Sequence, residues 1–163
     1  MAEFAVIATF FLMLIFAIIE FGRLMYTHNA LTDAARRGAR YAVLHHQNPK
    51  AGEADPVTCT KNVVVYGETH LDPVTCVPTG SPLINGLTTS NISVVYEGAD
   101  ADNDPSTPPT PYGMNLGTVT VSITNYTFNL SIPVVSRTVT MPPYRTTLTA
   151  ESAGEEPTPI PSP

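Results

Sequence analysis

The chain has 163 residues, of which 43% are hydrophobic and 13% charged, with sixteen prolines and no tryptophan. This length allows one domain, or a small domain with an appendage. All the prolines lie at or after Pro49, and residues 1–48 carry a net charge of +1 against −7 for the remainder. The chain therefore consists of two physically different parts. Because no lysine cluster exists to neutralise phosphates, a basic nucleic-acid binder is excluded and no nucleic-acid partner is expected.

The first part begins with a strongly apolar run. Residues 4–19 are apolar except Thr9, and a helix of that length spans about 24 Å against about 30 Å for a hydrocarbon core. The apolar residues just beyond the run extend it to a membrane span, with Glu20 and Arg23 near an interface. A cleaved signal peptide is the alternative. We disfavour it because Glu3 precedes the run and no small-residue cleavage site follows.

The helical pattern continues past this run. No proline interrupts it, good helix formers are frequent, and apolar residues recur at the helical period. We therefore predict one helix of about forty residues, roughly 60 Å long, that is amphipathic in its second half. Asp33 can pair with Arg36 or Arg37 on this helix, and Glu20 with Arg23, at i,i+3 or i,i+4 spacing. Gly22 and Gly38 each weaken it by about 1 kcal/mol, and a bend is expected near either.

The orientation signals conflict. The arginines after the apolar run favour a cytoplasmic C-terminal side. The downstream sequence is acidic, poor in lysine and rich in threonine and proline, and its two cysteines suit an oxidising exterior. We give more weight to the downstream composition, and a short basic leader before Met1 would remove the conflict.

Six short downstream segments are rich in β-branched or aromatic residues and are separated by clusters of Pro, Gly, Asp and Asn. They predict a small antiparallel sheet with long loops that leans on the amphipathic half of the helix, an α+β fold. The predicted organisation is an N-terminal helix over 1–48, an extracytoplasmic β-rich domain over 49–152 and a Pro-rich tail over 153–163. The predicted strands are residues 63–66, 92–96, 119–123, 126–132, 138–141 and 146–149.

Cys59 and Cys76 most simply form one disulfide, which stabilises by about 3 kcal/mol in the chain-entropy model. A metal site that joins them to His45, His46 or His70 is the alternative, but these residues lack a fixed ligand spacing. We therefore predict no metal and no cofactor.

The acidic segment 100–105 superficially suggests calcium. It departs from the EF-hand pattern because Pro105 replaces the glycine and Pro111 stands where the bidentate glutamate belongs. We therefore expect a solvated loop.

Three asparagines, Asn91, Asn125 and Asn129, lie in N-x-Ser/Thr sequons and are candidate glycosylation sites, with unmodified asparagine as the default. The Thr/Pro-rich stretches 104–111 and 155–163 have the composition of O-glycosylated segments. The sequence contains no nucleophile elbow, phosphate-binding glycine loop, HExxH or CxxC, so we predict a non-enzyme.

Three N-terminal blocks carry a family resemblance: AEFAV at 2–6, EFGRLMY at 20–26 and ALTDAARRGARYAV at 30–43. They resemble TadE-like proteins, which are pilin-like or pseudopilin components of tight-adherence (Tad) systems in the type IV pilus superfamily. The resemblance implies a leader removed by a prepilin peptidase, assembly through N-terminal helices and a C-terminal domain displayed outside. Two features depart from the family: no glycine-ending leader precedes Glu3, and the proline often found early in the apolar run is absent, which suggests an unkinked helix.

The resemblance also implies roles for particular residues. The family's acidic residue near the mature N-terminus corresponds to Glu3, which can pair with a neighbouring subunit's N-terminal amine and set the axial register; solvation at a membrane interface is the alternative. The assigned assembly residues are Glu3, Phe4, Glu20 and Arg23. The apolar run is expected to hold the subunit in the bilayer and then to form a filament core, with a plain membrane anchor as the alternative.

Arginines on the second half of the helix most simply form a solvated face. In a filament they are candidates to pair with acidic loops of neighbouring subunits. The residues concerned are Arg36, Arg37 and Arg40 on one side and Asp100, Asp102 and Asp104 on the other.

We therefore expect a structural pilin-like subunit of an extracellular filament for surface attachment, with a membrane-anchored precursor. Its expected partners are copies of itself, other pilins and the inner-membrane assembly machinery. The alternatives are a minor pseudopilin that stays at the membrane and assists assembly, and a single-pass anchored surface binding module.

Overall fold

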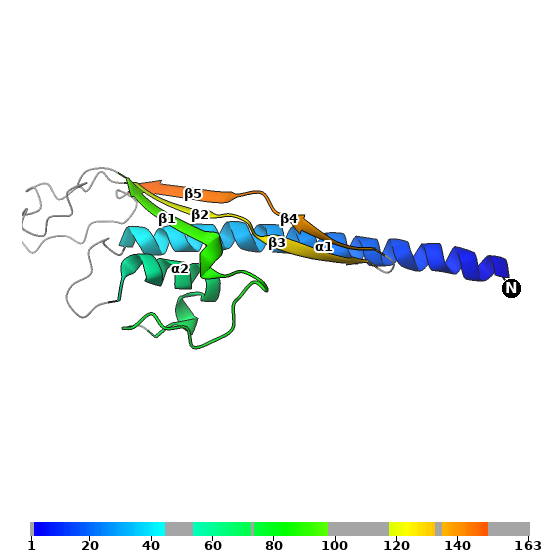
Figure 1. The fold of residues 1–163 in the computed structure, drawn as a ribbon, viewed down its shortest axis with the longest axis horizontal. Coiled ribbons are helices and arrows are strands. Elements are labelled where there is room, and N and C mark those ends of the chain that lie inside the picture. Colours follow the sequence, from blue (N-terminus) through cyan, green and yellow to red (C-terminus); the bar gives the residue numbers. More distant parts are fainter. Residues whose placement is uncertain (1, 45–53, 73, 98–117, 133–134, 150–163) are drawn as a thin grey trace, which may run out of the picture.

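The structure, a computed structural model, describes residues 2–44, 54–72, 74–97, 118–132 and 135–149. One long helix, α1 (Ala2–Leu44), runs the length of the molecule. Helix α2 (Pro56–Tyr66) and five strands cover its C-terminal half, whereas its N-terminal half projects beyond them (Figure 1). The predicted α+β arrangement, a long apolar helix packed on a small antiparallel sheet, is confirmed.

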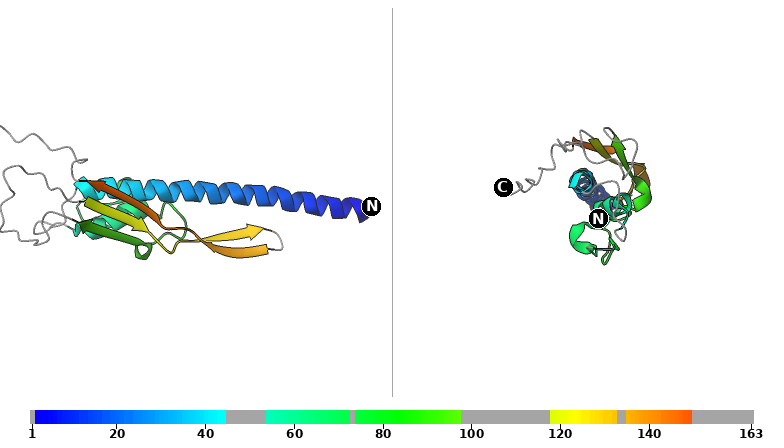
Figure 2. Two further views of the ribbon diagram at one scale, coloured as in Figure 1. Left: turned by 90° about the horizontal axis from the view of Figure 1, so that it is seen from above. Right: turned by 90° about the vertical axis from the view of Figure 1, so that its left-hand side faces the viewer.

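Helix α1 is continuous through both of its internal glycines (Figure 2). Where the rest of the protein packs on it, α1 presents a small-residue seam, a row of alanines with one leucine that are almost fully buried. A Cβ built on Gly38 would lie 2.2 Å from Cγ2 of Val64, so this glycine allows α2 to approach α1 closely. The buried residues of α1 in this seam are Leu31, Ala34, Ala35, Ala39 and Ala42.

The strand predicted at residues 63–66 is wrong, because these residues form the last turn of α2. The helix starts with two strong signals: the Asp55 carboxylate accepts a hydrogen bond from the Thr58 N–H at 3.0 Å, and Pro56 occupies the first turn. Residues 63–65 are fully buried. A short run of buried valines has the same pattern in a strand and in a helix, so here the cap and the packing decide.

The other five predicted strands are present within a few residues of their predicted bounds, but they form two sheets and not one. Strands β1 (Ile92–Glu97), β2 (Thr118–Ile123) and β5 (Tyr144–Thr149) form an antiparallel sheet in the order β1-β2-β5. Strands β3 (Thr127–Ile132) and β4 (Val135–Thr140) form a separate antiparallel hairpin. The described residues also include two short 3₁₀ helices, η1 (Glu68–His70) and η2 (Thr89–Asn91).

The chain leaves the first sheet at a turn between β2 and β3. Asn125 adopts a φ of 57°, a left-handed conformation that asparagine tolerates better than most residues. Directly after it, the carbonyl of Tyr126 accepts a hydrogen bond from the N–H of Met141 at 2.8 Å. This bond closes the base of the hairpin, from which β3 and β4 extend beside α1 (Figure 2).

The hydrophobic core lies between α1, α2 and the inner face of the three-stranded sheet. Alternation with Thr120 and Ser122 predicts that Val119, Val121 and Ile123 share one buried face. All three are buried, but Thr120 on the other face is buried as well. Because α1 supplies one wall of this core, the helix and the downstream strands fold around the same apolar interior.

Candidate functional site

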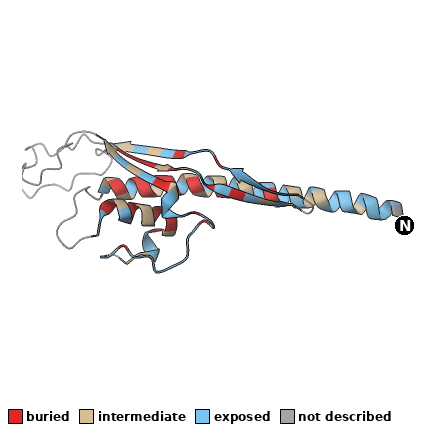
Figure 3. Cartoon of the chain, viewed as in Figure 1, coloured by how far each residue is buried: buried red, intermediate tan, exposed pale blue. Residues whose placement is uncertain are grey.

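The N-terminal half of α1 is an exposed apolar rod. Phe4, Ile7 and Phe10 have 76%, 68% and 69% of their surface exposed, and the residues around them are exposed as well (Figure 3). The helix is long and apolar enough to cross a membrane, judged by its length and composition. Exposed apolar surfaces of this extent mark sites that contact lipid or another protein.

Glu20 ends the apolar run and is almost completely buried. The hairpin covers it: Oε1 of Glu20 accepts a hydrogen bond from the N–H of Ser131 at 2.9 Å. The guanidinium of Arg23 also donates to Oε1, at 2.5 Å, which confirms the pairing expected from the i,i+3 spacing. A buried carboxylate is tolerated only when it is paired in this way.

Arg23 makes the second contact between α1 and the hairpin. Its guanidinium lies over the ring of Phe128, 4.5 Å from the ring centre, and donates to the backbone carbonyl of Asn129. Cation–π contacts of this kind stabilise partly exposed sites. Glu20 and Arg23 therefore hold β3 onto α1 at the point where the apolar run ends.

The four predicted assembly residues thus lie in two environments. Glu3 and Phe4 are exposed at the free end of α1, about 25 Å along the helix from Glu20 and Arg23. Glu20 and Arg23 contact the chain's own hairpin, and their assignment to assembly stays a prediction, as does that of Glu3 and Phe4. The contacts with Phe128, Asn129 and Ser131 were missed by the sequence analysis, because nothing in β3 shows which helix residues it meets.

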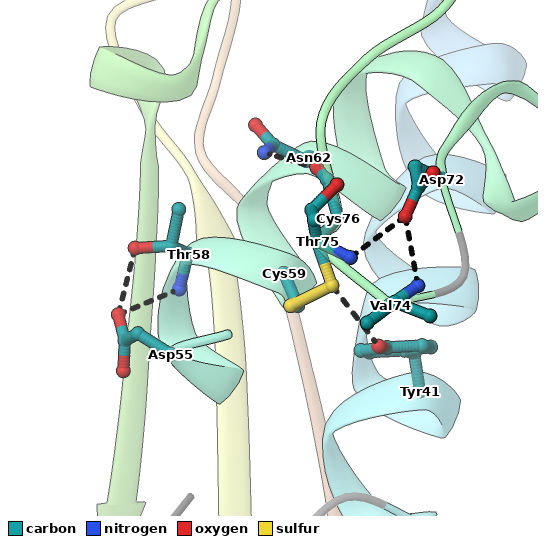
Figure 4. Close-up of a disulfide and its surroundings, with 9 residues drawn as sticks. All are labelled: Tyr41, Asp55, Thr58, Cys59, Asn62, Asp72, Val74, Thr75 and Cys76. Carbon is teal, nitrogen blue, oxygen red and sulfur yellow. Dashed lines mark hydrogen bonds between the residues drawn. A yellow bond between two sulfur atoms is a disulfide. The ribbon is translucent and has the colours of Figure 1, made fainter. Parts of the chain in front are cut away.

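A disulfide joins Cys59 on α2 to Cys76 in the irregular segment that follows (Figure 4). The side-chain amide of Asn62 donates to the backbone carbonyl of Cys76 at 2.9 Å, and the Tyr41 hydroxyl lies 3.9 Å from Cys76 Sγ. The disulfide therefore fixes this segment against both helices.

Asp72 shapes the turn that leads into Cys76. Its carboxylate accepts hydrogen bonds from the backbone N–H groups of Thr75 and Val74 at 2.8 and 2.9 Å (Figure 4). These bonds, that of Thr75 first, hold the pKa of Asp72 below its usual value. The turn is thereby built to favour the ionised carboxylate.

Metal binding receives no support from the part of the chain that the structure describes, where no three His, Cys, Asp or Glu side chains gather in a metal-ligating cluster. The cysteines of the alternative metal site are oxidised to a disulfide. His45, His46 and the acidic segment 100–105 lie outside the described residues.

The basic face of α1 borders an open groove of about 440 Å³, which η1 closes on its other side. Arg36 lies 3.9 Å from Asp33, which confirms one of the two pairings expected there. The groove is lined by Asp33, Arg36, Arg37, Arg40 and Glu68. The predicted partners of its arginines, Asp100, Asp102 and Asp104, lie outside the described residues, so that pairing stays a prediction.

The sequon asparagines differ in their surroundings. The Asn91 side chain donates to the carbonyls of Thr124 and Asn125, each at 3.2 Å, and so serves the fold. Asn125 and Asn129 are exposed, and the Asn129 side chain accepts a hydrogen bond from Thr138 at 3.2 Å. Glycosylation at all three sites stays a prediction.

Comparison with known proteins finds a family match over the N-terminal helix. The fold, a long apolar helix projecting from a small α+β body, is that expected of a pilin-like subunit. Residues 1–40 match the family described as TadE-like protein, which confirms the resemblance over α1. No curated protein and no solved structure matches the chain.

Proposed function

We propose that this chain is a structural subunit that polymerises through α1 into an extracellular Tad filament for surface attachment. One observation carries the proposal: residues 4–19 form an apolar rod that projects from the folded body with most of its large side chains exposed. Such a rod is stable in a bilayer before assembly and among the helices of neighbouring subunits afterwards. The match of residues 1–40 to the TadE-like family supports this role.

The proposed precursor is anchored in the membrane by α1, with the strands and α2 on the outer side. Assembly transfers the apolar rod from lipid to protein, and the pilus machinery and other pilins are the partners in that step. The disulfide between Cys59 and Cys76 supports the outer location, because disulfides persist in oxidising compartments.

Glu3 is the proposed register residue of assembly. It is exposed at the start of the apolar rod. When the rod enters an apolar filament core, burying the Glu3 carboxylate costs several kcal/mol unless a neighbouring subunit's amine pairs with it. Glu3→Ala is therefore expected to fold normally but to give few filaments. Glu3→Asp is the control, because it keeps the charge. A normal filament yield from Glu3→Ala refutes the register role.

The function is tested by shearing surface material from cells that express the chain together with a Tad assembly system. Electron microscopy combined with mass spectrometry is expected to show filaments made mainly of this chain. Retention of the chain in membrane fractions, with filaments made of another pilin, would refute the major-subunit role and support a minor pseudopilin that assists assembly.

An anchored surface binding module is the remaining alternative. The fold weighs against it, because α1 residues such as Leu31 and Ala35 form one wall of the core and a fragment 49–163 lacks them. We expect that fragment to be unfolded. A soluble, folded fragment that recognises a surface would instead support the binding module.

A further inference from the structure

The direction of the β3–β4 hairpin along α1 is fixed by its contacts. Arg23 contacts Phe128 and Asn129, whereas Glu20 contacts Ser131. As β3 proceeds toward its end, its partners on α1 therefore move toward the N-terminus. Figure 2 shows the hairpin reaching beyond the three-stranded sheet alongside α1.

The end of the hairpin consequently lies beside the apolar run. The last strand pair joins Ile132 to Val135, one residue beyond Ser131. A strand rises about 3.3 Å per residue and a helix about 1.5 Å, so this pair lies level with a point about two residues before Glu20. That point falls in the last turn of the apolar run, where Phe16, Ile18 and Ile19 remain exposed.

Along the hairpin, apolar residues at its end are followed by a cationic residue further from the end. Ile132 and Val135 form the last pair, and Arg137 is exposed two residues further back on β4, opposite Leu130. Arg23, half-exposed, lies at a similar level on α1. Ile132 followed by arginines fits a membrane interface, where an apolar side chain enters the acyl boundary and guanidinium groups reach lipid phosphates.

The end of the apolar run places the interface at this level. Residues 4–19 span about 24 Å, roughly 6 Å less than a hydrocarbon core. Glu20 is the first charged residue after the run, and its carboxylate is paired with Arg23 and the Ser131 N–H and so does not face lipid as a free charge. With the outer boundary of the hydrocarbon at Glu20, the hairpin end lies about 3 Å inside it and Arg23 about 4.5 Å outside it.

We propose that the end of the β3–β4 hairpin lies in the headgroup layer of the membrane, with Ile132 in the acyl boundary and Arg23 and Arg137 on the phosphates of anionic lipids. This inference rests on the proposed membrane-anchored stage and adds the surface that sets the depth of the chain in the membrane. The proposed binding partner of the hairpin end is a lipid surface, and the test must exclude a second copy of the chain as that partner.

The test uses the full chain in vesicles of phosphatidylcholine and phosphatidylglycerol, labelled with an environment-sensitive fluorophore on one introduced cysteine. Ser136→Cys lies near the hairpin end, and Thr140→Cys is the matched control on the same strand. Both positions are exposed and share one face, about 13 Å apart along β4. The native cysteines are in a disulfide and do not react with the label.

The label at 136 is expected to shift to shorter wavelength and to be quenched severalfold more by headgroup-attached nitroxide lipids than the label at 140. Arg137→Gln, or vesicles of phosphatidylcholine alone, is expected to reduce that quenching. Glu20→Ala, which removes the acceptor for Ser131, is expected to reduce it too. Equal, water-like spectra at 136 and 140 would overturn the inference, as would a signal at 136 that disappears on diluting the protein in lipid, since that indicates a second copy.

A third label, on Phe10→Cys in the apolar run, separates this inference from the proposed function. Quenching of this label by deep nitroxide lipids together with a water-like label at 136 refutes the hairpin contact and leaves the membrane stage intact. A water-like label at Phe10→Cys refutes the membrane stage itself, and the hairpin contact with it.

Discussion

Replacing Gly38 with alanine tests how closely the two helices approach. A Cβ at this position would lie 2.2 Å from Cγ2 of Val64, and ordinary contacts begin at 3.4 Å, so the neighbour must move by more than 1 Å. Val64 is β-branched and fully buried, and it has little freedom to rotate away. Overpacking of this kind costs about 1–3 kcal/mol, against a gain of about 1 kcal/mol in helix propensity. Gly38→Ala is therefore expected to lower the free energy of unfolding by up to about 2 kcal/mol.

Gly22→Ala is the matched control, because the same substitution on the same helix meets nothing within 4 Å. It is expected to leave stability unchanged or to raise it by up to about 1 kcal/mol. In a Val64→Ala background the clash disappears, so Gly38→Ala is expected to become neutral or stabilising there. A double-mutant cycle is then expected to give a coupling of about 1–3 kcal/mol.

The measurement is urea unfolding of the full chain in detergent micelles, followed by near-ultraviolet circular dichroism of its tyrosines. Two of these, Tyr126 and Tyr144, are buried in the core and report on its packing. Far-ultraviolet spectra check that helix content is retained. Equal stability of Gly38→Ala and Gly22→Ala, or independence of the effect from Val64, would contradict the close approach of α1 and α2.

Two further predictions concern the other elements that fix α2. Asp55→Ala removes the N-cap and is expected to cost about 1 kcal/mol in the same assay. Hydrogen bonds from Thr58 hold the pKa of Asp55 below its usual value of 3.8, so the contribution of the ionised carboxylate to the free energy of unfolding is full above that pH and is lost as the pH falls through the lowered pKa. Asp55→Asn keeps the cap but does not titrate, so it is expected to flatten this pH dependence. An unchanged loss of stability at acid pH in that variant contradicts the assignment. Reduction of the Cys59–Cys76 disulfide is expected to lower the free energy of unfolding by about 3 kcal/mol and to add two hydrogens to the intact mass. Hydrogen exchange in residues 67–91 is expected to become faster. Unchanged exchange there would show that the bond does not hold the segment.

The sequence predicted α1 because its signals are local: no proline, good helix formers and an unbroken apolar period over more than forty residues. Alternation within β2 likewise identified its buried face. The valines of 63–65 were misassigned because burial on all sides erases the periodicity that distinguishes a helix from a strand. The decisive cap at Asp55 is a local signal that was available and not used.

The site was less predictable than the fold. The spacing of Glu20 and Arg23 indicated an ion pair, but the hairpin that closes over them comes from more than a hundred residues further along the chain. Gly38 was interpreted as a bend because a glycine in a helix weakens it locally. Its role as a contact point depends on Val64, which only the tertiary structure places there.

The small-residue seam of α1 has a mechanical consequence. Because α1 passes lengthwise through the folded part and its free end carries the proposed assembly surface, a pull on that end acts along the helix axis. The contacts of Leu31, Ala35 and Ala42 with the sheet and α2 then bear the load together in shear, and the hairpin bonds at Glu20 and Arg23 share it. Contacts loaded in parallel must break at once, so the layout resists tension far better than one in which they peel apart singly. This layout suits the proposed role in a surface-attachment filament, which would load the helix in this direction.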